Sequence, residues 1–438
     1  MRQQVVKTTK RMTLLFLCGV TGMLLIYLSY MLPVARIRNH VKSGADILLQ
    51  ETAMYQYADG YVSAILDNST DDLMLAKTVY QSGDPLLDAV WAPNYAIPGQ
   101  DAGGLILFET LNSNDLSKAQ IDVYPIYWHG YLVLLKPLFL ILTYADFRIL
   151  NQILEFGLML LLLFLMQKRG LSRYIPACAA MLAFWNPATM GVSLQYAACF
   201  YLSIGASVLL FRKQRDSLLF FMLIGALTSF LDFLTYPLVT LCVPLITTIL
   251  LKSAERFSCR NISVVRSGIG DLFGKAVWWG IGYAGMWAQK WIYGSIVSKK
   301  NILVEASAKI AERSSAEESG EKISRLGTVL YLVKYSMMKK PYLILFLLCL
   351  GIILWMSFRN RKTVPDTKEA SGKIGKNGFY VELIIISLLP MLWFCFTANH
   401  SHMHPRLVYR TLGVSVYAGM VVITDLFFIY RRRIAGRE

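Results

Sequence analysis

Charged side chains are scarce in this sequence. Asp, Glu, Lys and Arg make up 16% of its 438 residues, whereas a typical soluble domain has roughly 25%. Hydrophobic residues make up 55%, and several apolar runs approach the roughly 20 residues that cross about 30 Å of hydrocarbon. Because these runs are continuous rather than alternating, they exclude a transmembrane β-barrel. The sequence therefore predicts an all-α fold, that of a polytopic helical membrane protein.

Cysteine pairs and the common nucleotide-binding and metalloenzyme motifs are also missing. The seven cysteines include no CxxC pair, so they predict neither a disulfide framework nor a cysteine zinc site. There is no P-loop, GxSxG, HExxH or Rossmann fingerprint. No predicted cytoplasmic region is long enough to bind a nucleotide. Chemistry driven by ATP, or by a nucleotide-sugar donor inside the cell, is therefore not supported.

Positive charge is in surplus, with 44 Lys and Arg against 28 Asp and Glu. In a soluble protein such a surplus indicates nucleic acid as a partner. Here much of it lies in short segments beside apolar runs, where Lys and Arg set membrane topology. We therefore expect no nucleic acid partner. We expect a multi-pass protein of the cell membrane with both termini in the cytoplasm.

The alternation of apolar and basic segments predicts about ten transmembrane helices. The predicted spans are residues 12–32, 146–166, 175–189, 193–211, 218–234, 236–251, 276–297, 341–357, 379–397 and 410–430. The apolar stretch 128–144 is interpreted as lying in the outer interface or re-entering, because a crossing there would place Lys168 and Arg169 outside. Lys136 and Pro137 in the middle of this short stretch support that interpretation.

This topology divides the chain into six segments. They are a cytoplasmic N-terminus with the first span (1–32), an extracytoplasmic loop with interface helices and an acidic motif (33–145), a transmembrane core (146–297), a second extracytoplasmic loop (298–340), C-terminal spans with a histidine-rich outer loop (341–430) and a cytoplasmic tail (431–438).

An acidic cluster lies early in the first extracytoplasmic loop. Asp67, Asp71 and Asp72 place three carboxylates in six positions. On a helix, residues four apart share a face, and like charges there repel unless a cation intervenes or a pKa is raised. The cluster therefore indicates a base for an acceptor hydroxyl, or a divalent metal (Mg²⁺ or Mn²⁺) at Asp71 and Asp72; no other cofactor is expected. The alternative is a helix start, with Asp67 or Thr70 as N-cap.

A histidine-rich segment forms a short outer loop in this topology. His400, His402 and His404 are three of only five histidines in the chain, and Arg406 and Arg410 follow them. Spacing of two places side chains on one side of an extended segment. These side chains suit a phosphate or pyrophosphate more than a metal. The alternative is polar filler at the membrane interface.

Single polar residues interrupt other apolar stretches. His129 lies in an aromatic interface stretch, and Lys290 lies among aromatic residues near the outer end of its span. Both could contact lipid phosphate, whereas anchoring at the interface is the alternative for His129. Asp232 is a carboxylate at membrane depth, where such residues are costly and usually functional.

The first 170 residues resemble the GT-C class of polytopic glycosyltransferases. The stretch from Asp71-Asp72 to Gly83 is similar to the acidic motif that opens the long outer loop in that class, with Leu75 where Tyr is common. Residues 124–137 are similar to its interface helix but lack a double proline, and residues 147–150 are similar to a following span start without its proline. The resemblance implies a polyprenyl-phosphate sugar as donor and Asp71 as base or metal ligand.

Three functions follow as hypotheses. The first is a membrane glycosyltransferase that moves a hexose or pentose from a polyprenyl-phosphate donor to an extracytoplasmic glycan or protein acceptor, such as a cell-envelope polysaccharide. Its partners are membrane lipids and the lipid-linked sugar. A site for such a donor requires cations on the outer side and a carboxylate, but no nucleotide-binding site. The alternatives are a transporter or flippase for a lipid-linked or polar solute, and a non-catalytic membrane assembly factor.

Overall fold

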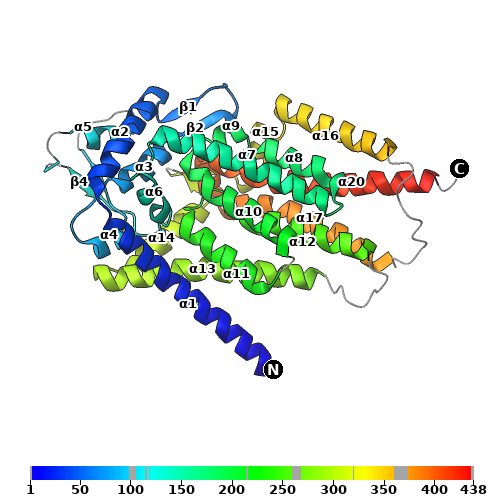
Figure 1. Ribbon diagram of the computed structural model, residues 1–438, viewed down its shortest axis with the longest axis horizontal. Coiled ribbons are helices and arrows are strands. Elements are labelled where there is room, and N and C mark those ends of the chain that lie inside the picture. Colours follow the sequence, from blue (N-terminus) through cyan, green and yellow to red (C-terminus); the bar gives the residue numbers. More distant parts are fainter. Residues whose placement is uncertain are drawn as a thin grey trace.

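The computed structural model describes residues 2–97, 105–113, 116–117, 119–213, 216–258, 268–318, 320–359 and 373–435. These residues are mostly helical, as predicted, and also form three two-stranded antiparallel sheets that the sequence did not predict. Long helices run roughly along the molecule in Figure 1, and a group of short elements covers one end of them.

The short elements form a cap, which we define as residues 33–143. It follows the first helix, α1 (Arg2–Tyr30). The cap contains α2 (Val34–Glu51), β1 (Met54–Gln56), β2 (Ile65–Asp67), α3 (Asn68–Thr78), α4 (Pro85–Trp91), β3 (Asn94–Ala96), α5 (Ile106–Asn112), β4 (Gln120–Asp122) and α6 (Leu132–Leu138). Strand β1 pairs with β2, placing Met54 opposite Asp67, and β3 pairs with β4, placing Asn94 opposite Asp122.

The long helices form the core of the molecule. They are α7 (Tyr144–Lys168), α8 (Ile175–Phe184), α10 (Leu194–Lys213), α11 (Leu218–Leu231), α12 (Val239–Ser258), α13 (Ile269–Ser298), α16 (Lys340–Arg359), α17 (Lys373–Phe396) and α20 (Gly413–Ala435), with the short α9 (Pro187–Met190) after α8. A buried hydrophobic cluster joins α7, α8, α10, α12, α17 and α20, and a second one joins α1, the cap and α11.

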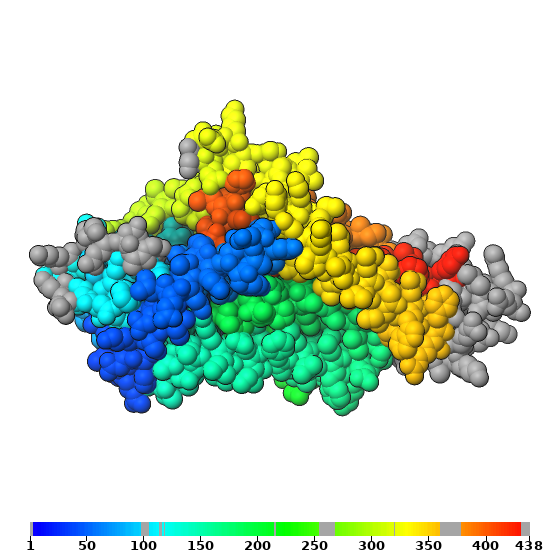
Figure 2. Space-filling view, turned by 90° about the horizontal axis from the view of Figure 1, so that it is seen from above, coloured from blue at the N-terminus to red at the C-terminus, as the bar shows by residue number. Residues whose placement is uncertain are grey.

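Two further segments lie between core helices. After α13 come α14 (Ile302–Ser314), the hairpin β5 (Glu317–Glu318) and β6 (Glu321–Lys322), and α15 (Arg325–Tyr335). After α17 come α18 (Ala398–Met403), α19 (Pro405–Val408) and a 3₁₀ turn (Tyr409–Leu412). In Figure 2 the surface near residue 400 lies between residues of the β1–β2 region and of α14 and α15, and α18 and α19 contact these same segments.

Six of the ten predicted spans coincide with helices that are long and apolar enough to cross a membrane. These candidate spans are Gln3–Tyr30, Tyr144–Lys168, Leu194–Lys213, Lys340–Arg359, Gly378–Phe396 and Pro405–Tyr430. The segment 128–144 contains only the seven-residue α6, which is too short to cross.

The other four predicted spans are helical but are not both long enough and apolar enough to count as candidate spans. Helices α8 and α11 have 10 and 14 residues, or about 15 and 21 Å at 1.5 Å per residue. In α12 the apolar part is Val239–Ser253, and α13 has 30 residues but includes glycines and buried lysines. The described residues thus form a helical protein with six candidate spans, and the count of ten stays a prediction.

Candidate functional site

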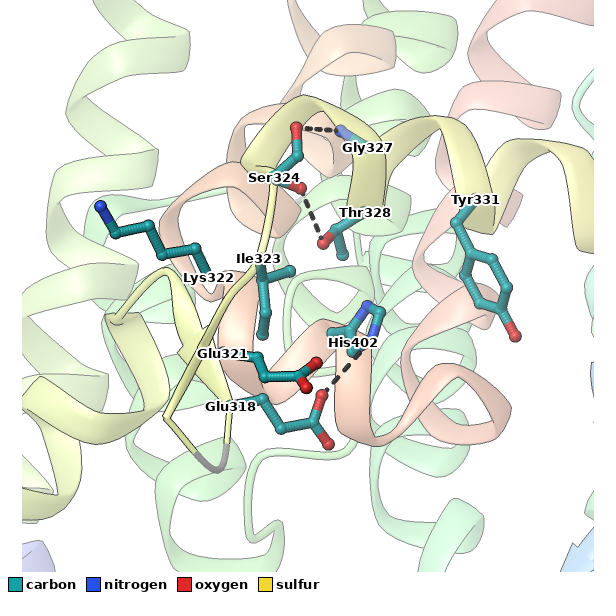
Figure 3. Close-up of a pocket in the computed structure, with 9 residues that line it drawn as sticks. All are labelled: Glu318, Glu321, Lys322, Ile323, Ser324, Gly327, Thr328, Tyr331 and His402. Atoms are coloured by element: carbon teal, nitrogen blue, oxygen red, sulfur yellow. Dashed lines mark hydrogen bonds and ion pairs between the residues drawn. The ribbon is translucent and has the colours of Figure 1, made fainter.

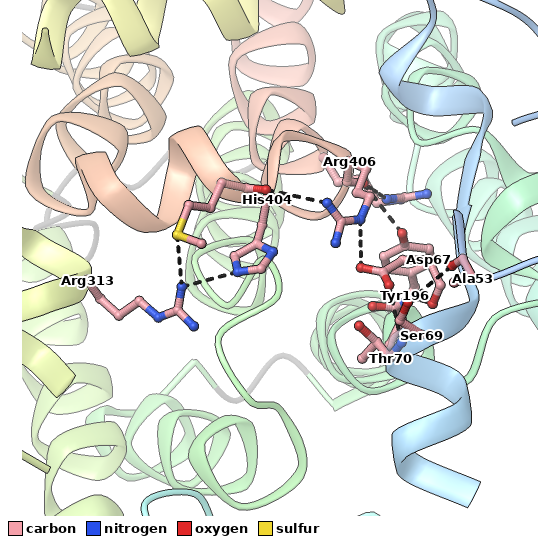
Figure 4. Close-up of polar contacts among 11 residues, drawn as sticks. Ala53, Asp67, Ser69, Thr70, Tyr196, Arg313, His404 and Arg406 are labelled. Atoms are coloured by element: carbon pink, nitrogen blue, oxygen red, sulfur yellow. Dashed lines mark hydrogen bonds and ion pairs between the residues drawn. The ribbon is translucent and has the colours of Figure 1, made fainter. Parts of the chain in front are cut away.

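Asp67 joins the cap to the start of the last candidate span. It ends β2 and is the N-cap of α3, where its Oδ1 accepts from the backbone N–H of Thr70 at 3.2 Å. This confirms the helix-start interpretation for Asp67. Its Oδ2 accepts from Nε of Arg406 in α19 at 2.7 Å. The side chains of Asp67 and Arg406 are 1% and 15% exposed, so the pair lies at the edge of the buried region (Figure 4).

Asp71 caps a helix far from it in sequence. Its carboxylate accepts from the backbone N–H groups of Leu194 at 2.9 Å and Gln195 at 3.2 Å, at the start of α10, and from the hydroxyl of Tyr144 at 2.8 Å. Burial raises the pKa of Asp71 to about 6, although these donors oppose the shift. Since Asp67 precedes the helix as its cap, the predicted shared face of Asp67 and Asp71 is not formed.

Asp72 caps a third helix. Its carboxylate accepts from the backbone N–H groups of Ile106 at 2.7 Å and Leu107 at 3.2 Å, at the start of α5. Burial raises the pKa of Asp72 to about 7. Asp71 and Asp72 thus point to different helices, and no three His, Cys, Asp or Glu side chains among the described residues are arranged to hold a metal ion. The described residues therefore provide no set of ligands for the divalent metal predicted at Asp71 and Asp72.

The histidine-rich segment is helical, which corrects the predicted extended conformation. In α18 and its C-cap, the four-residue spacing brings the rings of His400 and His404 to 4.9 Å, whereas His402 faces away from them and approaches Glu318 at 3.3 Å. Nε2 of His400 donates to the carbonyl of Leu234 at 2.7 Å, and Nε2 of His404 accepts from Arg313 at 3.1 Å.

The surroundings of both packed histidines favour the neutral form. Burial, reinforced by nearby cations, lowers the pKa of His404 to about 3, and burial likewise holds the pKa of His400 well below its usual range. The Nδ1 atoms of both rings are buried and have no hydrogen-bond partner among the described residues. His404 lies between Arg313 and the Arg406–Asp67 pair (Figure 4). Arg313 was not identified from the sequence, since its pairing across 91 residues leaves no local signal.

Arg410 is buried one turn beyond Arg406. It stacks on Tyr196, with 3.6 Å between the guanidinium carbon and the ring centroid, and its Nη1 donates to the Arg406 carbonyl at 2.7 Å. Its Nε and Nη2 are buried without a partner in the described chain, as is Oε2 of Glu155 in α7. Arg410 and Glu155 are 0% and 1% exposed. Glu155 was also missed from the sequence, although a lone acid in an apolar run is a recognisable signal.

Lys290 and His129 lie inside the protein rather than at a lipid-facing surface. Nζ of Lys290 donates to the carbonyls of Ala89 and Val90 at 2.9 Å each, near the end of α4. The ring of His129 is held at 3.0 Å by both the Tyr124 carbonyl and the Tyr131 hydroxyl. The exposed fractions of Lys290 and His129 are 0% and 4%, so neither reaches lipid phosphate in this structure.

Two more lysines support the same part of the cap. The sequence did not single out Lys77, whereas Lys136 belongs with His129 to the aromatic interface stretch, for which a functional role and anchoring are alternatives. Lys77 donates to the carbonyl of Ala92 and to the side chain of Asn94, and Lys136 donates to the carbonyl of Tyr80. Burial lowers the pKa of Lys77 and of Lys136 to about 7.

Asp232 has a local structural role. Its carboxylate accepts from the backbone N–H groups of Leu234 and Thr235 in the turn after α11. This turn also presents the Leu234 carbonyl to His400, so Asp232 holds the connection against which α18 packs.

Of the predicted residues, the structure brings Asp67, Arg406 and His404 together. Arg410 lies behind them, while Asp71 and Asp72 support the surrounding helices. A carboxylate beside arginines can accept a proton while the cations hold an oxyanion.

Comparisons of the chain with protein-family models, with curated proteins and with solved structures found no match. Function is therefore inferred from the geometry.

Proposed function

We propose that this protein is a membrane glycosyltransferase that moves a hexose or pentose from a polyprenyl-phosphate donor to an extracytoplasmic acceptor. The observation that carries the proposal is the ion pair between Asp67 and Arg406, at 2.7 Å, where the cap meets the start of the last candidate span. A lipid-linked donor requires a cation and a carboxylate at such a junction and no nucleotide site.

Arg406 and Arg313 supply the groups that a donor phosphate requires. Both contribute positive charge around His404, and arginine matches phosphate oxygens with paired N–H donors. An aromatic cluster lies beside α14, where Tyr124, Trp287, Trp291 and Trp393 pack against Ile126, Tyr127, Leu234 and Ala306. The partly buried tyrosine and tryptophans of this cluster keep apolar area that suits the first isoprene units of a lipid whose phosphate is held by the arginines.

The transfer step uses Asp67 as base. When donor phosphate oxygens take the N–H groups of Arg406, the carboxylate of Asp67 becomes available to an acceptor hydroxyl. The hydroxyl proton passes to Asp67, the acceptor oxygen bonds to the anomeric carbon, and the bond from that carbon to the phosphate oxygen breaks. The electron pair leaves on polyprenyl phosphate, whose charge the arginines stabilise.

Asp71 acts as a positioning residue in this proposal. It accepts from the backbone N–H of Gln195 at 3.2 Å, and the side chain of Gln195 donates to the carbonyl of Asp67 at 2.8 Å. Asp71 therefore fixes the residue that holds the proposed base. The resemblance-based prediction that Asp71 is itself the base remains the competing assignment.

The proposal is tested with purified protein in proteoliposomes. Polyprenyl phosphates carrying different labelled hexoses and pentoses are supplied with a cell-envelope extract as acceptor. We expect label to leave one of these carriers, and Arg406→Ala to slow the transfer at least about 100-fold. Arg36→Ala, which removes an exposed arginine of α2, is the matched control. Label that stays on every carrier contradicts the proposal.

The buried charges Glu155 and Arg410 favour a transporter or flippase of a lipid-linked or polar solute as the second candidate. Both lie in candidate spans and have unpartnered atoms within the described chain, and ionisable groups at membrane depth often mark solute pathways. The same proteoliposomes test this function with a lipid-linked sugar placed in one leaflet. Movement of the intact molecule, lost in Glu155→Gln, supports it; transfer of the sugar without such movement excludes it.

A further inference from the structure

A separate cavity opens beside the β5–β6 hairpin. Its volume is about 490 Å³, and it lies between the hairpin, the start of α15 and α18 (Figure 3). It is lined by Glu318, Glu321, Lys322, Ile323, Ser324, Gly327, Thr328, Tyr331 and His402. None of these residues belongs to the Asp67–Arg406 centre, and only His402 was identified from the sequence.

The hairpin presents two carboxylates to this cavity. Its register sets Glu318 directly opposite Glu321, a like-charge pairing that destabilises a hairpin unless something lies between the charges. Glu318 has His402 as partner at 3.3 Å. In the described part of the chain the carboxylate of Glu321 has no hydrogen-bond or ion-pair partner, and Figure 3 shows it beside Glu318 and His402. The carboxylate of Glu321 is thus available to a ligand.

The negative charge of Glu318 and Glu321 determines which ligands the cavity can bind. Lys322 extends away from the carboxylates in Figure 3, so it does not neutralise them. A phosphorylated or carboxylated ligand would be repelled. A metal ion is not favoured either, because Glu318, Glu321 and His402 do not form a metal-binding group among the described residues. The cavity therefore suits a neutral or cationic organic ligand.

Tyr331 adds an aromatic surface. Its ring lies 4.6 Å from that of Tyr335 and 6.2 Å from that of His402, measured between centroids. A sugar ring has an apolar C–H face that packs on such a surface, and its hydroxyl groups donate to carboxylates. An amine on the sugar would add a charge-assisted hydrogen bond to Glu318 or Glu321.

We infer that this cavity binds a glycan unit without acidic groups, either a neutral or an amine-bearing sugar. His402 lies two residues before His404, so the cavity and the Asp67–Arg406 centre adjoin the same short segment. We assign the bound glycan the role of acceptor. That role rests on the proposed function, whereas binding of the sugar does not.

Direct binding in lipid nanodiscs tests the inference by saturation-transfer NMR and calorimetry. The probes are a glucosamine tetrasaccharide, its N-acetylated neutral form and a galacturonic acid tetrasaccharide. We expect the first two to bind and the acidic one not to bind. Glu321→Gln and Tyr331→Ala should each weaken binding about tenfold, equivalent to about 1.4 kcal/mol.

Glu305→Gln is the matched control, because it removes an exposed carboxylate of α14 that does not line the cavity. Thermal unfolding of each variant verifies its fold. Equal binding of the acidic tetrasaccharide, unchanged binding in both cavity variants, or no saturable binding of any probe overturns the inference. Binding that persists in a protein that transfers no sugar would instead contradict the proposed function and leave the binding site intact.

Discussion

Asp71 and Asp72 are adjacent in the chain yet stabilise two different helices. Each replaces water at a helix N-terminus, where a side-chain oxygen satisfies backbone N–H groups and the helix dipole favours negative charge. Burial opposes the same negative charge, and for both residues burial is the larger effect on the pKa. The ionised forms are therefore costly at neutral pH, even though both carboxylates are fully hydrogen-bonded.

Asp72 should make the stability of the protein depend on pH. Its pKa rises from an ordinary value near 3.8 to about 7 in the folded state. Folding therefore favours the protonated form of Asp72. The stability that the protonated carboxyl contributes is lost as pH rises from about 4 to 7. When the pH is lowered from 8 to 5, the free energy of unfolding of the wild type should rise by roughly 2–3 kcal/mol relative to that of Asp72→Asn. Unfolding in detergent, followed against temperature and denaturant at both pH values, measures the difference.

A control isolates the buried carboxylate. Asp59 is an exposed carboxylate of the cap, so Asp59→Asn should unfold with the same pH dependence as the wild type. If the stabilities of Asp72→Asn and of the wild type change equally with pH, Asp72 is ionised in the folded protein at little cost. Its burial would then not raise its pKa.

At the scale of elements, α11 and α13 approach each other through glycine. An added Cβ at Gly282 would lie 2.0 Å from the carbonyl oxygen of Met222, and one at Gly225 would lie 2.0 Å from that of Trp279. Both obstacles are backbone atoms, which cannot move aside as a flexible side chain does. Small residues permit such close packing between membrane helices.

Gly282→Ala should therefore destabilise the protein. The helices must separate to admit the methyl group, at a cost of about 1–3 kcal/mol. Gly280 lies on the same helix with no neighbour within 4 Å of an added Cβ, so Gly280→Ala should be neutral or slightly stabilising. Thermal unfolding of the two single variants compares them. Equal effects would mean that the close contact of α11 and α13 is not formed.

Local patterns predicted the elements better than their partners. The helix after Asp67, the first span and the short interface helix followed from capping, hydropathy and proline, which act within a few residues. The partner of Asp71 is a helix end 123 residues away, and that of Arg406 is an aspartate 339 residues away. Patterns of residue spacing act only over a few residues. The sequence therefore identified Asp71 and Arg406 as candidates but could not predict their partners.

The histidine segment was predicted in the wrong conformation for a related reason. Spacing of two is compatible with either a strand or a helix. The helix formed brings His400 and His404 onto one face and leaves His402 for the hairpin. The candidate site therefore contains fewer histidines than predicted and one unpredicted arginine, Arg313.

At the scale of the molecule, the cap and α14 lie toward one end in Figure 1, and the described end of α20 lies at the other. The predicted topology, in which the cap is outside, stays a prediction. Asp101, which this topology places outside, and Lys362, which it places inside, lie outside the described residues.

Cysteine labelling at described positions tests the orientation. Glu312 of α14 and Lys213 of α10 are both exposed. In a cysteine-free background, we expect Glu312→Cys to react with a membrane-impermeant maleimide in intact cells. Lys213→Cys should react only after the membrane is permeabilised, because basic residues concentrate on the cytoplasmic side. The reverse pattern would place the Asp67–Arg406 centre in the cytoplasm and remove the basis for an extracytoplasmic acceptor.

We propose that sugar transfer uses Asp67 as its base and Asp71 as a support. The most direct measurement is the transfer rate of Asp67→Asn and Asp71→Asn in proteoliposomes that contain equal amounts of folded protein. We predict that Asp67→Asn lowers the rate by about 10²–10⁴-fold, the usual contribution of a general base. Asp71→Asn, which keeps an oxygen for the N–H groups of α10, should lower it less than about tenfold. Full activity in Asp67→Asn together with loss in Asp71→Asn would show that Asp71, and not Asp67, is the base.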